Sequence, residues 1–225
     1  MKAMDVISRD VVTCRPGDEI AEVVKLLAER DVSALPVVDD SGMVVGVISE
    51  ADLMRREEID TEKHRPWWLE AVTPGITLAK EFAREHGRKV DEIMSDTVVS
   101  ASEDTSLAEI ATLLEKHRIK RVPILRDGKL VGIVSRSNLI QALASSSHVQ
   151  AGGDAPGDRS IRLELLDRLD GQAWTDFGSR NVIVRDGVVH LWGLVGSEEE
   201  HKALVALAEQ VPGVKGLSDE TFPAY

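Results

Sequence analysis

An internal repeat is the feature of this sequence that most restricts its fold. Residues 5–13, DVISRDVVT, match residues 92–100, EIMSDTVVS, at a displacement of 87 residues. The match resumes between residues 33–53, SALPVVDDSGMVVGVISEADL, and residues 120–139, KRVPILRDGKLVGIVSRSNL, where the second copy lacks one residue at the turn before glycine. A chain that repeats a pattern of this length is expected to fold as two similar units.

Each copy carries the signals of the same elements in the same order. Apolar residues recur at helical spacing over residues 18–29 and again over residues 107–114. PVVDDSGMVVGVI and PILRDGKLVGIV are each two β-branched runs around Asp and Gly turn residues, which is typical of a hairpin. Pro36 and Pro123 fit the first residue of a strand better than its middle, because proline has no N–H to donate. The pattern predicts a β-α-β-β-α unit in each copy.

Two stretches around the second copy have no counterpart elsewhere in the chain. Residues 56–88 form an insert that contains HRPWWLE. Trp67 and Trp68 either form a ligand or partner surface or pin the insert onto the core, and the second alternative is favoured. Residues 144–158, ASSSHVQAGGDAPGD, are small and polar with glycine and proline, which is typical of a flexible linker.

The remaining residues, 159–225, show the pattern of a small α-β-β-α-β module. IRLELLDRL aligns its apolar residues on one helical face, and NVIVRDGVVHLWGLV predicts two strands around an Asp-Gly turn. Ser197 stands three residues before Glu200, which predicts a capping box for the next helix. A Pro-Gly pair ends that helix, and VKGLSDE predicts a third strand.

The first 143 residues resemble a tandem pair of CBS motifs, the Bateman module. The resemblance rests on Gly46-Val-Ile-Ser49 with Asp52, on Gly132-Ile-Val-Ser135 with Asn138, and on the two proline-containing strands. The tail is similar to a BON domain through VRDGVVHLWGLV and VPGV. The expected fold is therefore α+β (α/β-like), with two β-α-β-β-α CBS repeats packed as a pseudo-two-fold pair and a small α-β-β-α-β BON-like domain. The expected domains are CBS motif 1 at 1–55, the insert at 56–88, CBS motif 2 at 89–143, the linker at 144–158 and the BON-like domain at 159–225.

In both copies an apolar strand ends at a serine that begins a helix. The unpaired N–H groups and the dipole of such a helix start attract anions. Asp52 offers two carboxylate oxygens that can accept hydrogen bonds from paired ribose hydroxyls, whereas Asn138 offers one acceptor and one donor. The same spacing also fits a helix cap, in which the short polar side chain satisfies the helix start. One residue can fill both roles.

The resemblance implies two nucleotide sites in the cleft between the CBS motifs. Their ligand is an adenosine-containing molecule such as AMP, ADP, ATP or S-adenosylmethionine, with or without Mg²⁺. The resemblance implies that this molecule is a regulatory ligand and that no cofactor is required. Lys120 and Arg121 stand where the first copy has Ser33 and Ala34, and they either reach phosphate or are solvated charges at a helix end. The implied nucleotide-binding residues are Thr13, Ser49, Asp52, Ser100, Lys120, Arg121, Ser135 and Asn138.

No catalytic or metal-binding constellation stands beside these sites. The six histidines show no His-Glu-x-x-His spacing, and the chain has no Gly-x-Ser-x-Gly elbow and no Gly-rich loop followed by Lys and Ser or Thr. The single cysteine, Cys14, can form neither an internal disulfide nor a Cys-rich zinc site. We therefore predict no catalytic residue and no metal site.

Charge restricts the partners. The net charge of -12 repels nucleic-acid backbones and anionic lipid surfaces, so we expect no nucleic-acid partner and no strong membrane binding. The N-terminal MKAMDVISRD has charges where a signal peptide needs an apolar run, and no stretch of the chain is as long and apolar as a membrane span. A cytoplasmic location is expected.

Two functions from different classes fit these observations. The first is a cytoplasmic regulatory protein that binds an adenosine ligand, forms a homodimer through its CBS pairs and relays occupancy to the BON-like domain, which contacts an unknown protein partner. The alternative is a non-enzymatic structural or interaction protein with vestigial nucleotide sites, which docks a protein partner or a membrane through the BON-like domain. An enzyme with an embedded regulatory module is disfavoured, because the tail is small and lacks catalytic residues.

Overall fold

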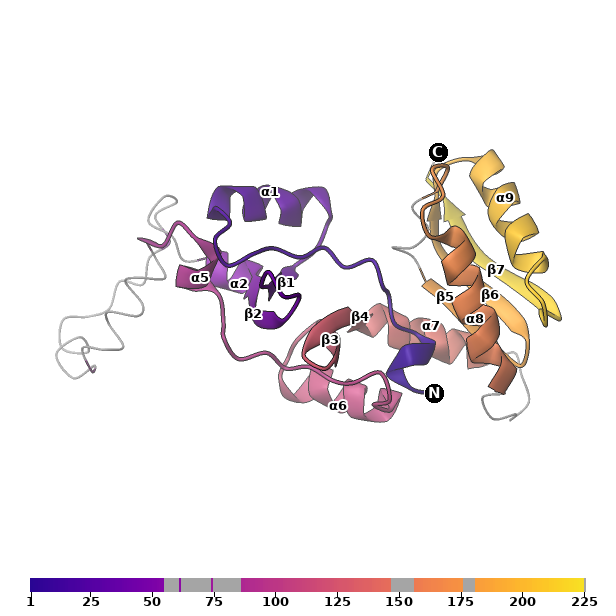
Figure 1. The fold of residues 1–225 in the computed structure, drawn as a ribbon, viewed down its shortest axis with the longest axis horizontal. Coiled ribbons are helices and arrows are strands. Elements are labelled where there is room, and N and C mark those ends of the chain that lie inside the picture. The colour runs from indigo at the N-terminus through magenta and orange to yellow at the C-terminus, as the bar shows by residue number, and fades with distance from the viewer. Residues whose placement is uncertain (55–60, 62–73, 75–85, 147–155, 176–180, 225) are drawn as a thin grey trace. The chain divides into compact units, whose positions relative to one another are not determined.

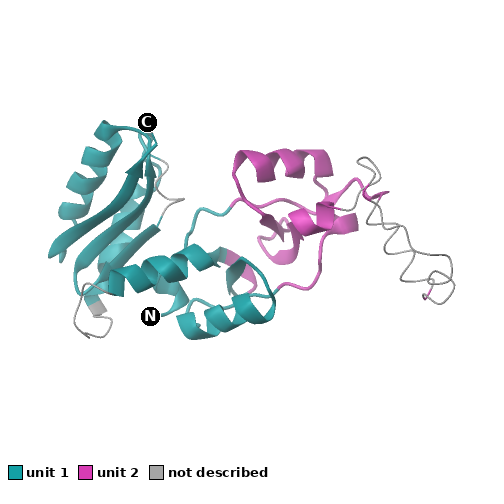
Figure 2. Cartoon of the chain, turned by 180° about the vertical axis from the view of Figure 1, so that it is seen from behind, with its two compact units in different colours: residues 1–11, 99–127, 131–225 teal, residues 12–98, 128–130 magenta. Residues whose placement is uncertain are grey.

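The computed structural model describes residues 1–54, 61, 74, 86–146, 156–175 and 181–224, which form a mixed α+β fold as predicted (Figure 1). Trp67 and Trp68 lie outside the described residues, as do residues 147–155 of the expected linker. The chain divides into two compact units (Figure 2). The smaller unit contains residues 12–98 and 128–130, and the larger contains residues 1–11, 99–127 and 131–225.

The first repeat forms the smaller unit. Its strands β1 and β2 pair antiparallel, with Leu35 opposite Ile48. The strand expected before them is a single parallel bridge from Cys14 to Val37. The amphipathic pattern of residues 18–29 becomes a helix that buries Ile20, Val23 and Leu27. The elements are α1 (Ile20–Glu29), β1 (Ala34–Val38), β2 (Val44–Ser49), α2 (Glu50–Leu53) and α5 (Val90–Ile93).

The second repeat has the same plan in the larger unit. A parallel bridge joins Ala101 to Ile124, and β3 and β4 form a two-stranded sheet. Ser106 starts α6 with a capping box, since its hydroxyl accepts from the Glu109 N–H and the Glu109 carboxylate accepts from the Ser106 N–H. The elements are η1 (Ala3–Asp5), α6 (Leu107–Lys116), β3 (Arg121–Arg126), β4 (Lys129–Ser135) and α7 (Arg136–Ser146).

The two prolines lie inside their strands, so the prediction that each begins a strand is wrong. Pro36 is in β1 and pairs with Val47, and Pro123 is in β3. The bridge beside each strand needs only the proline carbonyl, which accepts from the Cys14 N–H at 3.1 Å and from the Ala101 N–H at 3.0 Å. A missing N–H therefore costs no hydrogen bond on that side.

The short helix that begins each repeat packs in the core of the other repeat. Ala3, in η1, donates its N–H to the carbonyl of Thr105 at 2.8 Å, and Val90, in α5, donates to the carbonyl of Asp18 at 3.1 Å. Both acceptors lie at the start of a repeat's helix, and the two bonds are equivalent under the sequence repeat. The chain therefore completes each CBS-like core with a segment from the other copy.

This exchange explains the glycine in each copy of the repeated motif. A Cβ on Gly46 would lie 3.0 Å from the carbonyl oxygen of Ser95, and a Cβ on Gly132 would lie 2.6 Å from that of Ser8. Those serines follow α5 and η1, so each exchanged segment crosses directly over a motif glycine. Only glycine leaves room for this approach of the backbone.

The C-terminal module has the predicted α-β-β-α-β order. Its sheet has the order β5-β6-β7, in which β5 and β6 are antiparallel and β6 and β7 are parallel. Ser197 caps α9 by accepting from the Glu200 N–H at 3.0 Å, but the Glu200 carboxylate accepts from the N–H of Gly196 at 2.6 Å and not from Ser197. The elements are α8 (Pro156–Leu169), β5 (Asn181–Arg185), β6 (Val188–Val195), α9 (Glu198–Glu209) and β7 (Gly216–Pro223).

Both faces of this sheet are covered, by different parts of the chain. One face packs on α8 and α9, whose Leu165 and Leu204 share a core with Val182 and Leu191. Ile183, on the opposite face, belongs to the core that contains Ala3, Val6, Ile110 and Ala142 of the second repeat and its exchanged segment, and Trp192 packs against that core. The C-terminal module and the second repeat therefore share a continuous hydrophobic core.

Helices occupy both ends of the expected linker, since α7 runs to Ser146 and α8 begins at Pro156. Proline suits a helix start, where its missing N–H has no intrahelical acceptor. The domain boundaries expected from the sequence stay predictions.

Candidate functional site

In the first repeat, the serine at the end of β2 is held by the acid three residues later. Asp52 Oδ2 accepts from the backbone N–H of Ser49 at 2.9 Å and from its hydroxyl at 2.6 Å. Ser49 is in extended conformation and is the N-cap of α2. Asp52 is half-buried, and its second oxygen, Oδ1, accepts no hydrogen bond from the described part of the chain. The helix-cap interpretation is confirmed here, and one fixed carboxylate oxygen stays available to a ligand.

The second repeat has the same cap with an amide. Asn138 Oδ1 accepts from the Ser135 N–H at 2.7 Å and from the Ser135 hydroxyl at 2.8 Å. The amide nitrogen, Nδ2, donates to Ser8 Oγ at 3.3 Å and lies 3.5 Å from Gln141 Oε1. Asn138 is only 4% exposed. The asparagine uses both of its polar atoms within the protein, and its amide nitrogen acts as a donor, which no oxygen of a carboxylate can do.

Thr13 and Ser100 hold equivalent places beside the two hairpins. The residue after Thr13, Cys14, bridges to β1, and the residue after Ser100, Ala101, bridges to β3. Thr13 is exposed and Ser100 is half-buried. Thr13 lies in the same compact unit as Ser49 and Asp52, and Ser100 lies with Ser135 and Asn138. The structure thus divides the predicted residues into one set for each repeat.

Basic residues gather at the start of α7. Arg136 donates its backbone N–H to the carbonyl of Lys120 at 3.3 Å and its Nη2 to the carbonyl of Ile119 at 3.2 Å. Lys120 is exposed, and Arg121, which begins β3, is half-buried. Three cationic side chains therefore belong to the strand and helix ends beside Ser135.

The first repeat carries the opposite charge at the corresponding place. Glu50 donates its N–H to the carbonyl of Ser33 at 3.0 Å, so Glu50 and Ser33 stand where the second repeat has Arg136 and Lys120. Phosphate groups are attracted to the basic start of α7 and repelled by the acidic start of α2. The two candidate sites thus differ in electrostatics.

Sequence reasoning missed Arg136 and Gln141. Arg136 directly follows the predicted Ser135, so the basic character of VSRSN was a usable signal. Gln141 gave no signal, because its importance depends on which residue of the C-terminal module lies beside it.

The thiol of Cys14, next to Thr13, is not reactive. Burial, with a smaller contribution from the negative charge of Asp18, raises the pKa of Cys14 to about 12. Only 4% of this residue is exposed. The thiol therefore stays protonated, and Cys14 serves as a small apolar residue of the core.

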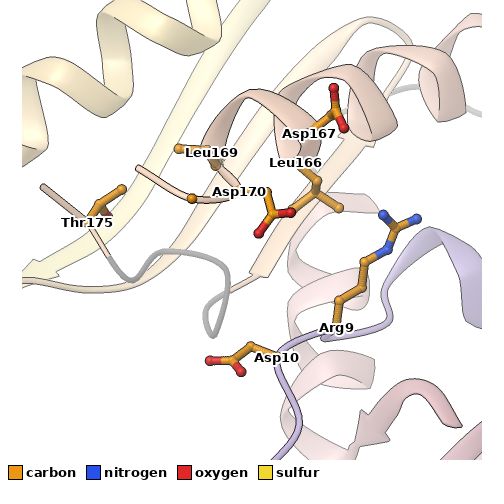
Figure 3. Close-up of a pocket in the computed structure, with 8 residues that line it drawn as sticks. Arg9, Asp10, Leu166, Asp167, Leu169, Asp170 and Thr175 are labelled. Atoms are coloured by element: carbon orange, nitrogen blue, oxygen red, sulfur yellow. The ribbon is translucent and has the colours of Figure 1, made fainter. Parts of the chain in front are cut away.

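A pocket of about 450 Å³ lies apart from the predicted residues, between residues 9–10 and the end of α8. Figure 3 shows the Arg9 side chain extended toward Leu166 and Asp167, whereas Asp10 points away from Arg9. Because three carboxylates and one guanidinium line the pocket, it is unsuited to an anionic ligand. The pocket is lined by Arg9, Asp10, Leu166, Asp167, Leu169, Asp170, Gly171 and Thr175.

No group of three or more His, Cys, Asp or Glu side chains in the described ranges is placed to hold a metal ion. Within those ranges, no helix has both the length and the apolar character needed to cross a membrane.

Comparison with protein families accounts for most of the chain. The CBS domain model matches residues 3–58 and again residues 90–145, and the BON domain model matches residues 157–221. Both resemblances found in the sequence are thereby confirmed.

Individual relatives agree with these family matches. An uncharacterised protein of Methanocaldococcus jannaschii, MJ1426, is 30% identical over 64% of this chain and 91% of its own length. The chloroplastic CBS domain-containing protein CBSX2 of Arabidopsis thaliana is 29% identical over 57% of this chain, which spans 56% of that protein. An inosine-5'-monophosphate dehydrogenase of M. jannaschii is 27% identical, but the match spans only 26% of that enzyme.

Solved structures agree at the level of the fold. The crystal structure of CBSX2 in complex with AMP superposes with a TM-score of 0.56 at 27% identity, covering 64% of this chain and 97% of that one. With two matched CBS repeats, a matched BON domain and a 30% identical relative covered over nearly its whole length, the chain belongs to the CBS-domain family and carries a C-terminal BON domain.

Proposed function

We propose that this chain is a non-enzymatic regulatory protein that binds adenosine nucleotides through its CBS repeats. The observation that carries the proposal is the Asp52 carboxylate, which the Ser49 cap fixes through one oxygen while the other accepts nothing from the described residues. A fixed, half-buried acceptor suits a ribose hydroxyl.

AMP is the first ligand to test, because AMP is the ligand in the CBSX2 complex. ADP, ATP and S-adenosylmethionine share its adenosine part, and Mg²⁺ would accompany the ligands that carry several phosphates. The proposed contacts are Thr13, Ser49 and Asp52 in the first repeat and Ser100, Lys120, Arg121, Ser135 and Asn138 in the second. The cytoplasmic location expected from the sequence stays a prediction.

The second part of the proposal is that the BON domain responds to ligand. Its support is the core that this domain shares with the second repeat, through Ile183, Trp192 and Ala142. Two bodies with a common core cannot move independently without exposing apolar surface. An unknown protein partner would then bind the BON domain with an affinity that depends on the position or the dynamics of this domain.

The alternative, an interaction protein with vestigial sites, is favoured by a different observation. Both helix caps are complete without ligand, because Ser49 and Ser135 each donate two hydrogen bonds to Asp52 and Asn138. A cap alone is a sufficient structural reason for these residues.

Thermal unfolding of ligand-free protein separates the two functions. Ligand at a hundred times its dissociation constant adds about 2.7 kcal/mol, which raises the melting temperature by roughly 5–10 °C for a chain of this size. Inorganic phosphate at the same concentration is the control for a general anion effect. If AMP, ADP, ATP and S-adenosylmethionine at millimolar concentration all leave the melting temperature unchanged, the sensing function is wrong and the vestigial alternative stands.

We also propose a homodimer that forms through the CBS repeats. Ile140 and Leu143, three residues apart on α7, are 67% and 68% exposed, and Met54, at the position of the first repeat that corresponds to Ile140, is 67% exposed. Exposed apolar side chains at equivalent places suit a self-complementary contact. Light scattering at micromolar concentration should give the dimer mass, and Ile140→Glu with Leu143→Glu should give a monomer. A wild-type monomer would rule the dimer out.

A further inference from the structure

A chain of amide side chains runs from the helix cap of the second repeat into the BON domain. Asn138 and Gln141 belong to α7, where Asn138 Nδ2 lies 3.5 Å from Gln141 Oε1. Asn181, the first residue of β5, donates from Nδ2 to the same oxygen at 2.8 Å. Asn181 Oδ1 lies 3.5 Å from Nη2 of Arg162, in α8. α7, α8 and β5 lie together in Figure 1, and these side chains join them.

Most of this chain of side chains is buried. Asn138 is 4% exposed, Asn181 and Arg162 are 3% exposed, and Gln141 is half-buried. Ala142, next to Gln141, belongs to the core that joins the second repeat to the BON domain. A buried amide that loses its partner pays the full cost of desolvation, so a change at one member is felt by the next.

The arrangement is specific to the second repeat. The first repeat has Arg55 at the position that corresponds to Gln141. Arginine has donors but no acceptor, so it cannot receive the hydrogen bond that Asn181 gives to Gln141. The repeat that shares its core with the BON domain is therefore the one that has an acceptor at this position.

We propose that Gln141 and Asn181 are positioning residues through which the BON domain senses the state of Asn138. The inference rests on the proposed function, in which an adenosine ligand contacts Asn138. A ribose hydroxyl that donates to Asn138 Oδ1 competes with the two bonds from Ser135, and the resulting turn of the amide changes the position of Nδ2 relative to Gln141. Because coupling is reciprocal, the BON domain in turn sets the ligand affinity of the second repeat.

Two substitutions at Gln141 test the chain of contacts in the full-length protein. Gln141→Met keeps the length and the helix propensity of the side chain but removes the acceptor, whereas Gln141→Glu keeps an acceptor oxygen for Asn181. Gln210→Met, at an exposed glutamine that ends α9, is the matched control. AMP is titrated into each variant by calorimetry, and hydrogen exchange of the β5 amides is measured with and without AMP.

In the wild type we expect AMP to change the exchange of the β5 amides. Gln141→Met should abolish this change and shift AMP affinity at one of the two sites about fivefold or more. Gln141→Glu should restore both, and Gln210→Met should behave as the wild type. Asn181→Ala removes the donor from the BON side and should give the same loss, so the test does not depend on the folding of one variant.

The outcomes separate this inference from the function on which it rests. If AMP binds and Gln141→Met leaves the β5 response intact, the coupling is wrong and nucleotide binding stands. If Gln141→Met lowers only the melting temperature, or Gln141→Glu fails to restore the response, the amides are structural and the inference is overturned. If the wild type binds no AMP, the proposed function fails and the inference fails with it.

Discussion

Arg162 donates a hydrogen bond from Nη2 to the carbonyl oxygen of Ile7 at 2.6 Å, joining the BON domain to the first segment of the first repeat. Its Nε donates to the carbonyl of Val182 at 2.6 Å, and its Nη1 donates to that of Met4 at 3.2 Å. Burial, together with the nearby positive charge of Arg9, lowers the pKa of Arg162 to about 10. Carbonyl oxygens from three places in the chain thus hold a buried cation.

The first prediction is that Arg162→Met strongly destabilises the protein. The buried carbonyls of Ile7 and Val182 and the half-buried carbonyl of Met4 lose their donor. Each unsatisfied buried group costs about 1–3 kcal/mol, so we expect a loss of roughly 3 kcal/mol or more. Urea denaturation of the full chain measures this loss.

Arg168→Met is the control for the Arg162 substitution. Arg168 lies on the same helix and pairs with Glu164 at its surface, at a distance of 2.8 Å. Such exposed pairs contribute about 0.5 kcal/mol or less. Equal stability of the two variants would show that the hydrogen bonds of Arg162 to the three carbonyls do not stabilise the fold.

The second prediction concerns the exchanged segment. A Cβ at Gly132 would lie 2.4 Å from Ile7 Cγ1 and 2.6 Å from the carbonyl oxygen of Ser8. Backbone cannot move as a flexible side chain can, so we expect Gly132→Ala to cost about 1–3 kcal/mol. Urea denaturation gives the cost, and hydrogen exchange should show faster exchange of the Ser8 and Ile133 amides, which pair with each other at 3.0 and 2.9 Å.

Two other glycines give the comparison. Gly46→Ala should cost less, because its closest contact, 2.6 Å, is to the flexible side chain of Met94. Gly157→Ala should be neutral or stabilising by up to about 1 kcal/mol, since nothing lies within 4 Å and alanine favours the helix α8. If Gly132→Ala is as harmless as Gly157→Ala, the segment does not cross where the structure places it.

Local patterns in the sequence predicted the elements well, because each depends on a few neighbouring residues. Asp-Gly pairs predicted the hairpin turns of the second repeat and of the BON domain, and Asp186 and Gly187 do adopt positive φ values of 52° and 82°. Helical spacing predicted α1 and α8 together with the residues that they bury. The prediction that each proline begins its strand was wrong, because the sequence of a strand alone does not show which segments pair with it.

The exchange of segments and the covering of the BON sheet could not be predicted in this way. Both depend on contacts between residues far apart in sequence, such as Ser8 with Asn138, which are separated by 130 positions. In the candidate site, the spacing of Ser49 and Asp52 predicted the cap. The burial of Asn138 could not be predicted, because it follows from what packs on α7. The change from aspartate to asparagine at the second cap thus has a structural reason in addition to any ligand.

The third prediction concerns acid stability of the BON domain. Burial tends to raise the pKa of Asp219, but hydrogen bonds from Thr221 and His201 outweigh it, and the pKa lies below its ordinary value of 3.8. The unfolded chain therefore binds the proton more readily than the folded one, so the contribution of Asp219 to stability is present above pH 3.8 and is lost as the pH falls through the lower folded value.

Asp219→Asn tests this contribution. The variant should be less stable than the wild type at about pH 6, and the difference between the two melting temperatures should narrow as the pH falls below 3.8 and the wild-type carboxyl becomes protonated. A difference between Asp219→Asn and the wild type that does not change with pH would show that ionisation of Asp219 adds nothing to stability.

The fourth prediction is that Asp52→Ala weakens every adenosine ligand at one site. Loss of a hydrogen bond to a charged group costs about 1.5–3 kcal/mol, or roughly ten- to a hundred-fold in affinity. AMP and ATP should lose similar factors, because ribose is common to both. Calorimetric titration of both ligands into the variant gives these factors, and a change for ATP alone would place Asp52 beside phosphate instead of ribose.

The fifth prediction distinguishes the second site by its charge. Arg121 begins β3 directly after Lys120, whose carbonyl accepts from the Arg136 N–H at the start of α7. If it reaches the ligand there, its contribution should grow with the number of phosphates. We expect Arg121→Ala to weaken ATP about tenfold more than AMP, measured by calorimetric titration at fixed ionic strength. Lys116→Ala, at an exposed position on the last turn of α6, is the matched loss of one positive charge and should weaken both ligands equally or not at all. An equal effect of Arg121→Ala on AMP and ATP would mean that this side chain is a solvated charge and does not reach phosphate.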